Sequence, residues 1–176
     1  MNQTIEVILK RKGTMSYTSQ QICESDMEII ISAGIAGPTA RNLQTRHFTI
    51  VQNKELLQQI DNGVRILMGA PTEYNALYGA PSLIITSAPI ENAPFADQDC
   101  AAAVENMSLA ATSLGLGSRY VVSPTRFIES EAGKTVQQAL GIPQGYRCVA
   151  CLIVGYDADP SQTPVSRNMD VVNYVK

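Results

Sequence analysis

The longest β-strand candidate of this chain spans residues 146–156 and is apolar over most of its length. A shorter apolar run at residues 82–86 follows Ala80-Pro81. A continuously apolar strand is expected to be buried, because it lacks the alternation of a sheet with one solvated face. Helical and strand-like segments interleave along the chain, which predicts an α+β fold with a central mixed or antiparallel sheet flanked by helices. The length of 176 residues predicts a single domain over residues 1–176.

The other elements follow from hydrophobic periodicity. Helices are expected at the segments where apolar residues recur at helical spacing: 27–35, 53–68, 100–114 and 129–140. Asp99 is the expected cap of the third of these helices. Shorter strands are expected at 48–52 and 120–123. Residues 1–9 fit a helix or a strand equally well.

Charge and hydropathy exclude several classes of protein. The net charge is −3 and the pI is about 5.1, so a general nucleic-acid surface with clustered Lys and Arg is not expected. No apolar run approaches the roughly 18 residues of a membrane helix, and residues 1–12 do not read as a signal peptide. These observations predict a cytoplasmic protein with neither a nucleic-acid nor a membrane partner.

The cysteines and the single histidine offer no evident metal or nucleophilic site. Cys148 and Cys151 are three positions apart in a strand, so they are predicted to point to opposite faces. That geometry disfavours the redox pair or metal site that the CxxC spacing alone suggests. The four cysteines are interpreted as small buried hydrophobes in a reducing compartment. His47 lies at the start of a predicted strand and is interpreted as structural.

No Rossmann turn, Walker loop or zinc motif is present, and no metal site is expected. The pair Gly115 and Gly117 follows a predicted helix instead of opening one. An enzyme so poor in histidine, and without paired acidic clusters, is expected to take its reactivity from a cofactor.

Two stretches have residue types suited to a cofactor. The cations of residues 10–12, followed by Gly13, suit a phosphate group, although a solvated basic turn explains them equally well. In the loop at residues 36–48, the amides of Asn42 and Gln44 carry donors and acceptors that suit the edge of a planar heterocycle. These two residues are also typical of helix caps and loops.

The sequence resembles the nitroreductase family of flavin mononucleotide (FMN) enzymes. The most specific match is Asn106-Met107, followed by the Leu-Gly-Leu-Gly-Ser run that ends at Ser118. In the loop after the first long helix, four residues stand in register with the family pattern: Pro38, Asn42, Gln44 and Phe48. Thr39 replaces the usual serine there, and Thr45-Arg46 replaces the usual Pro-Trp.

The basic segment departs from the family pattern at two positions. Arg11 and Lys12 match the first two cations, but Gly13 replaces a serine and Met15 replaces a second basic residue. In the resembled family that residue helps to hold the pyrimidine edge of the flavin. Either another residue substitutes for it, or the flavin is held and tuned differently. Asp157 also stands where the family usually has proline.

The resemblance implies a nitroreductase-like fold, FMN as cofactor and NADH or NADPH as reductant. Hydride would pass to flavin N5 and then to a nitroaromatic, a quinone or a similar acceptor in a ping-pong reaction, with no catalytic side chain. The resemblance also implies a homodimer, in which residues 38–44 of one chain complete the flavin site of the other. The implied cofactor-binding residues are Arg11, Lys12, Gly13, Met15, Pro38, Thr39, Ala40, Asn42, Gln44, Asn75, Val121, Val122, Ser123 and Arg167. Val122 is the residue whose backbone N–H is expected to face N5.

Two alternatives remain open at this point. The departures from the family pattern leave room for a flavin-binding protein of the same fold with little turnover. An α+β interaction module without a cofactor is the second alternative. The sequence names neither the physiological acceptor nor the preferred coenzyme, and it gives no redox potential.

Overall fold

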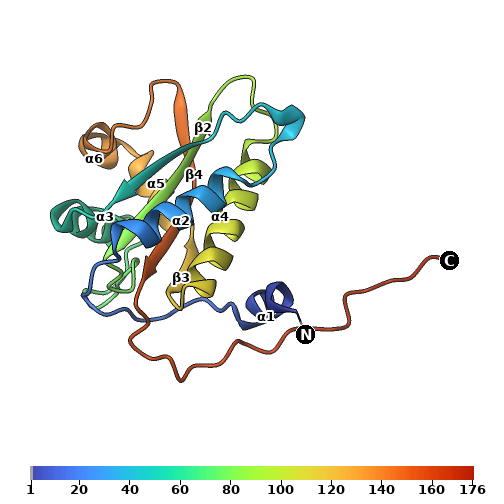
Figure 1. Ribbon diagram of the computed structural model, residues 1–176. Helices are drawn as coiled ribbons and strands as arrows, with labels where there is room; N and C mark the ends of the chain where they lie inside the picture. The colour runs from blue at the N-terminus through green and yellow to red at the C-terminus, as the bar shows by residue number, and fades with distance from the viewer. Residues whose placement is uncertain (1) are drawn as a thin grey trace.

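Four antiparallel strands form the central sheet, in the spatial order β1-β2-β4-β3 (Figure 1). The structure is a computed structural model that describes residues 2–176. The strands are β1 (His47–Val51), β2 (Ser82–Pro89), β3 (Gly117–Val121) and β4 (Tyr146–Gly155). The two apolar runs of the sequence become the two central strands, β2 and β4, which are buried along most of their length.

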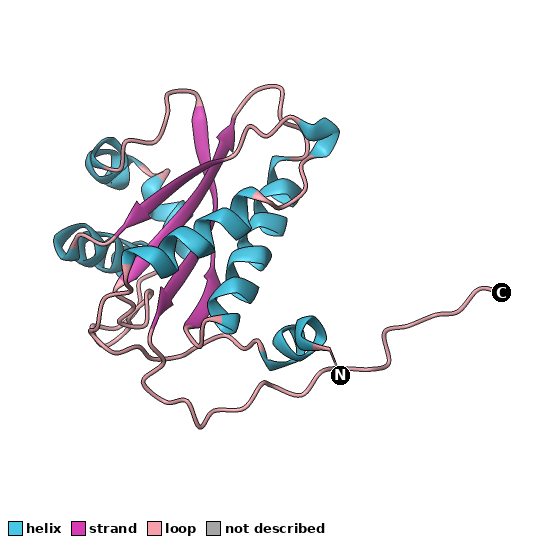
Figure 2. Cartoon of the chain, in the orientation of Figure 1, coloured by secondary structure: helices cyan, strands magenta, loops and turns pink. Residues whose placement is uncertain are grey.

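Helices cover both faces of this sheet (Figures 1 and 2). On one face, α2 and α4 pack over strand residues such as Ile84 and Leu152. On the other face, α3, α5 and α6 pack over Leu83 and Ile153. The expected α+β architecture is therefore confirmed. The α-helices are α1 (Gln3–Lys10), α2 (Glu24–Ile35), α3 (Lys54–Leu67), α4 (Ala96–Ser113), α5 (Ser123–Ile128) and α6 (Lys134–Ala139).

Some boundaries differ from the sequence prediction. Helix α4 begins at Ala96, so Asp99 lies in its first turn and is not its cap. A helix over 129–140 is wrong: α5 ends at Ile128, and the 3₁₀ turn η2 (Glu131–Gly133) comes before α6. Pro124 near the start of α5 favours an early helix, since its fixed φ suits the first turn. The chain therefore leaves β3 at Val121, and a strand reaching residue 123 is also wrong.

The prediction that Cys148 and Cys151 point to opposite faces is wrong, because β4 carries a bulge. Ala150 pairs with Thr86 and Cys148 with Ser87, so Val149 is an extra residue in the ladder. A bulge of this kind shifts the alternation of side chains by one position. Both cysteines consequently lie in the core on the α3 side of the sheet.

Burial makes three of the four thiols unreactive. Cys23 is exposed, whereas Cys100, Cys148 and Cys151 are buried. Burial raises the pKa of each of these three thiols, so the thiolate that attacks an alkylating reagent is scarce. We expect iodoacetamide at pH 8 to label one cysteine per folded chain and all four in urea, as counted by intact mass spectrometry. Cys23→Ser should leave the folded chain unlabelled, and rapid labelling of that variant would contradict the buried positions.

Candidate functional site

A backbone pairing places the N-terminal basic segment at the edge of the sheet. The N–H of Thr14 donates to the carbonyl of Ser118 at 3.0 Å, and the N–H of Thr18 donates to the carbonyl of Tyr156 at 2.9 Å. Thr14 also packs closely on Gly117, where an added Cβ would lie 2.6 Å from the Thr14 Oγ1. The segment after α1 is thus fixed along β3 and the end of β4, which covers the β3 edge.

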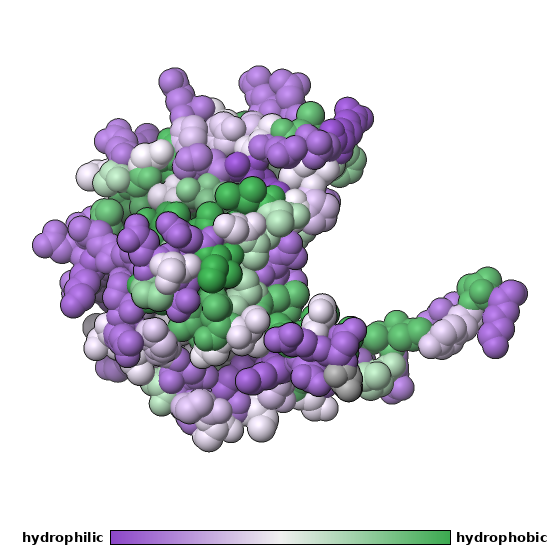
Figure 3. Space-filling view, viewed as in Figure 1, coloured by the Kyte–Doolittle hydropathy of each residue, from purple (hydrophilic) through white to green (hydrophobic). Residues whose placement is uncertain are grey.

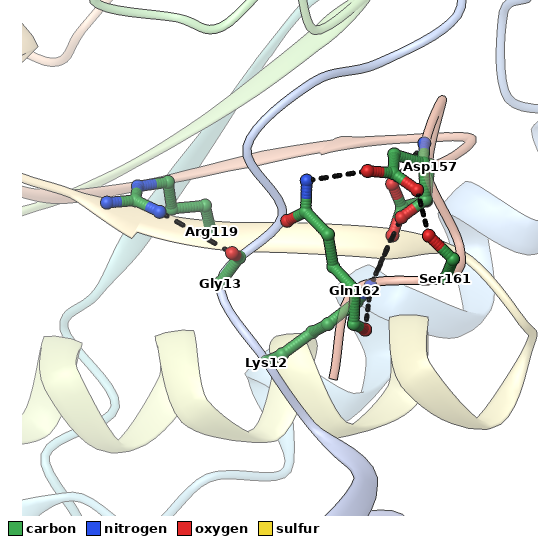
Figure 4. A network of polar contacts seen from close by, with 7 residues as sticks. Lys12, Gly13, Arg119, Asp157, Ser161 and Gln162 are labelled. Carbon is green, nitrogen blue, oxygen red and sulfur yellow. Dashed lines mark hydrogen bonds and ion pairs between the residues drawn. The ribbon is translucent and has the colours of Figure 1, made fainter. Parts of the chain in front are cut away.

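Two of the basic residues in this segment are already paired with acids, and Figure 4 shows the pair that Lys12 forms. Lys12 Nζ lies 2.9 Å from Asp157 Oδ2 and donates to the carbonyl of Gln162 at 2.6 Å. Arg11 Nε lies 3.1 Å from Glu105 Oε1 on α4. Lys12 therefore ties the segment after β4 to the N-terminal segment, and Arg11 and Lys12 each have an internal counter-charge.

An arginine that the sequence analysis did not select lies beside Gly13 and Met15. Arg119 projects from β3, and its Nη1 contacts the Met15 Sδ and lies 3.5 Å from the Gly13 carbonyl (Figure 4). Its guanidinium lies over the ring of Tyr78, 4.6 Å from the centroid. The signal that could have found it is an arginine directly after the glycine-rich run that ends at Ser118.

Asn75 organises the turn that carries Tyr78. Its Oδ1 accepts hydrogen bonds from the N–H of Leu77 at 3.0 Å and from that of Gly79 at 3.2 Å. Tyr78 has a φ of +56°, a left-handed conformation that a side chain rarely adopts without such support. The acceptor of Asn75 is thus used within the turn, and only its amide N–H groups remain for a ligand.

The two amides of the loop after α2 bond to one another. Gln44 Nε2 donates to Asn42 Oδ1 at 2.9 Å, and the N–H of Gln44 donates to Thr39 Oγ1 at 3.2 Å. Both residues have positive φ, as does Arg41. Neither amide caps an α-helix, and both are exposed, so they remain available to a second molecule.

Arg46 and Asp99 hold this loop in place. Arg46 donates to the carbonyls of Gly37 at 2.7 Å and Asp99 at 2.9 Å, and the Oδ1 of Asp99 accepts from the N–H of Ala40 at 2.9 Å. Arg46 also donates to the carbonyl of Pro38 at 3.3 Å. These contacts satisfy carbonyls at the end of α2 and in the following turn. Arg46 is a positioning residue that sequence reasoning noted only as a departure.

Within one chain the loop and the basic segment lie at opposite ends of α4 (Figure 1). The loop is bound to Asp99 in the first turn of α4, whereas Lys12 and Thr14 line a pocket together with Thr112 in its last turn. Thirteen residues separate Asp99 from Thr112, which at 1.5 Å per residue is about 20 Å. A single chain therefore does not bring residues 38–44 to the basic segment.

Of the remaining predicted residues, three lie close to Arg119 in the chain and one lies on the C-terminal tail. Val121 is buried at the end of β3, Val122 is exposed, and Ser123 begins α5, so these residues lie just after Arg119 in the chain. Arg167 lies on the exposed C-terminal tail, which leaves the body of the molecule (Figure 1). The structure does not bring Arg167 to Arg11 within one chain.

The phenol of Tyr17 is buried in the segment that follows α1. Burial raises the pKa of the Tyr17 phenol, while the Thr14 side chain and the Arg119 guanidinium act in the opposite direction. Tyr17 is therefore neutral at physiological pH. Among residues 2–176 no group of His, Cys, Asp and Glu could hold a metal ion. No helix in that range is both long enough and apolar enough to cross a membrane.

Solved structures identify the fold as that of the nitroreductases. A nitroreductase with bound FMN from Bacteroides fragilis aligns with a TM-score of 0.89 and 28% identity over 100% of both chains. A second, from Desulfitobacterium hafniense and also with bound FMN, aligns with a TM-score of 0.90 and 26% identity over 100% of both chains. The chain matches the nitroreductase family over residues 8–156 and belongs to it, as an enzyme of the nitroreductase class. A protein of Archaeoglobus fulgidus, provisionally named an NADH dehydrogenase/NAD(P)H nitroreductase, is 29% identical over 159 residues, 90% of this chain and 88% of that protein.

The contacts of Lys12 predict a local structural role. Lys12→Met should lower the free energy of unfolding by about 1–3 kcal/mol, because a carbonyl and a half-buried carboxylate lose a charged donor. Hydrogen exchange should rise in residues 157–162, which Lys12 holds. Lys10→Met, the same change at an exposed lysine two residues away, is the matched control. Urea unfolding and exchange mass spectrometry measure the two effects, and equal behaviour of both variants would contradict the role.

Proposed function

We propose that this chain is an FMN-dependent oxidoreductase that moves reducing equivalents from NADH or NADPH to a quinone, a nitroaromatic or a similar acceptor. We further propose that it acts as a homodimer with the flavin between the two chains. The observation that carries this proposal is the family match, together with Arg119 beside the basic segment at the β3 edge, which has no acidic partner among residues 2–176.

Several features of the chain fit a bound flavin. Two similar structures contain FMN. Arg11 and Arg119 supply cations for an anionic cofactor, and Tyr78 supplies an aromatic surface next to Arg119. When bound, FMN would supply the hydride-accepting centre that the side chains lack. The protein would then bind and orient the cofactor and leave an open, apolar slot for the two substrates.

A second copy of the chain is needed to assemble the proposed residues. The pocket that Lys12 and Thr14 line has a volume of about 220 Å³. Sites for small molecules and cofactors usually enclose about 300–1,000 Å³, so this pocket in one chain is too small for FMN. Because residues 38–44 lie at the other end of α4, we propose that they reach the basic segment of the partner.

The surface of one chain has the apolar character of an interface. Figure 3 shows apolar side chains gathered over the α2 side of the molecule and a hollow beside α1. A groove of about 500 Å³ lies between α1, α2 and α4. Exposed apolar residues include Ile8 on α1 and Ile35 on α2, with 44% and 60% of their surfaces exposed. The tail adds Val165, Met169, Val171, Val172, Tyr174 and Val175. Exposed apolar residues that gather on one face are typical of association surfaces.

A flavin-binding protein with little turnover is the second candidate. The observation that favours it is the pairing of Arg11 with Glu105 and of Lys12 with Asp157. Both cations are already partly neutralised, so they attract the cofactor phosphate less strongly than free cations would.

A visible spectrum and a mass measurement test the proposal directly. The purified protein, after incubation with FMN and removal of excess, should be yellow and elute as a dimer in light-scattering chromatography. Anaerobic NADH or NADPH should bleach it, and a quinone should restore the colour. Yellow protein that neither coenzyme bleaches would support the second candidate. A colourless monomer would overturn the proposal.

The family resemblance implies that Arg11, Lys12 and Arg167 hold the FMN phosphate, and variants of two of these residues give a second test. Arg11→Ala and Arg167→Ala should each weaken FMN binding by about tenfold to a hundredfold, because each removes a charge-assisted contact. Glu105→Gln should strengthen binding by about twofold to fivefold, because it releases Arg11 from an exposed ion pair. Arg126→Ala, at an exposed arginine on α5, is the control. Quenching of flavin fluorescence measures the affinity, and no change in any of the three variants would refute the phosphate assignment.

A further inference from the structure

We propose that Arg119 is the residue that binds the pyrimidine edge of the flavin, at N1 and the C2 carbonyl, and that it takes the place of the cation missing at Met15. This inference rests on the proposed function, since it concerns how the same FMN is held. The proposal assigns to Arg119 on β3 a cofactor contact that, in the resembled family, a basic residue at the position of Met15 makes.

The charge of Arg119 has no acidic partner in the part of the chain that the structure describes. Two neighbouring cations, Arg11 and Lys12, each lie within 3.1 Å of a carboxylate oxygen. Arg119 instead contacts a thioether, which is a weak acceptor, and a carbonyl at the long distance of 3.5 Å. Both contacts use Nη1, so across residues 2–176 the N–H groups of Nε and Nη2 have no acceptor. Arg119 therefore retains both its charge and most of its donors for a ligand.

The neighbours of Arg119 hold its guanidinium in one place. The ring of Tyr78 lies below it at 4.6 Å, a distance typical of a cation–π contact. Gly13 lies beside it, and an added Cβ at Gly13 would be only 3.2 Å from Nη1. The absence of a side chain at position 13 thus provides the space that the guanidinium occupies. The two departures at Gly13 and Met15 have one explanation, since both residues border this side chain.

The surroundings of Arg119 suit a ring better than a phosphate. Tyr78 offers an aromatic face and Met15 a polarisable thioether, which 48% exposure leaves accessible from outside. Val121, the last residue of β3, and the exposed Val122 follow shortly after Arg119, and both are apolar. The lysines of the basic segment instead line the pocket on the α4 side, away from Tyr78.

An arginine at this edge stabilises one redox state more than the other. Uptake of a hydride from NADH or NADPH, which is two electrons and one proton, leaves the reduced ring with a negative charge over N1 and the C2 carbonyl. A fixed cation beside those atoms stabilises the charge as it develops. Arg119 should therefore raise the two-electron potential of bound FMN, because it strengthens binding of the reduced form more than binding of the oxidised form.

Substitution of Arg119 tests this directly. Arg119→Met should weaken binding of reduced FMN by about tenfold to a hundredfold and that of oxidised FMN less than threefold. The potential of the bound cofactor should then fall by about 15–60 mV, which is the ratio of the two affinity changes expressed for a two-electron couple. Arg119→Lys should lower the potential by no more than half of the decrease seen in Arg119→Met, because it keeps a cation. Arg126→Met should have the potential of the unaltered protein. Spectroelectrochemistry gives the potential, and fluorescence titration of FMN and riboflavin gives the affinities.

Two further variants keep the test independent of any folding defect in Arg119→Met. Gly13→Val should displace the guanidinium and lower the potential without altering Arg119. Met15→Arg in the Arg119→Met background should raise the potential again, because it brings a cation back to the same place from the N-terminal segment. An unaltered protein that binds no FMN would overturn the proposed function and this inference together. FMN binding with the same potential in all variants would overturn only the role of Arg119. Equal weakening of both redox states for FMN and none for riboflavin would assign Arg119 to the phosphate, and would also overturn it.

Discussion

The candidate site depends on a short backbone pairing between the N-terminal segment and the edge of β3. Thr14 donates to Ser118, and a bridge joins Gly13 to the same residue. This pairing brings position 13 against the side chain of Arg119, one residue further along the strand. It also requires Gly117, because Thr14 approaches that residue too closely for any side chain. The glycine-rich run after α4 thus has a steric purpose: it admits the segment that carries the cations.

Helix α4 sets the geometry of everything else. Its first turn holds the loop of residues 38–44 through Asp99, and its last turn borders the basic segment. A rigid helix of this length keeps the loop of residues 38–44 away from the basic segment. One small ligand could not contact both groups of polar residues within a single chain. The proposed dimer therefore rests on the position of the loop as much as on the exposed apolar surface, because a second chain could bring the two groups together without breaking the helix.

The fold was largely predictable from the sequence, whereas the site was predictable only in part. Continuous apolar strands at β2 and β4 and helical periodicity in α2 and α3 identify the layers, because burial dominates those patterns. The bulge at Val149 was not predictable, since it reflects a local mismatch between two strands and leaves no signature in the sequence. The contacts of Arg46 and Arg119 were missed for a similar reason. Each arginine joins segments that are distant in sequence. The local sequence around an arginine does not distinguish a solvent-exposed side chain from one that donates to four carbonyls, as Arg46 does.

Charge placement around the site separates structural cations from those that can serve a ligand. Asp157 draws Lys12 toward the segment after β4, where its ammonium also satisfies a backbone carbonyl. Removal of that lysine would leave a partly buried carboxylate and a carbonyl without their charged donor, which is why Lys12 is better placed to join two segments than to bind a ligand. Arg119 is held by an aromatic ring and a thioether, neither of which neutralises it. A cation held by neutral neighbours keeps its full electrostatic field. Because the position of such a cation is fixed in advance, it could stabilise a negative charge on a bound ligand without any rearrangement of the protein.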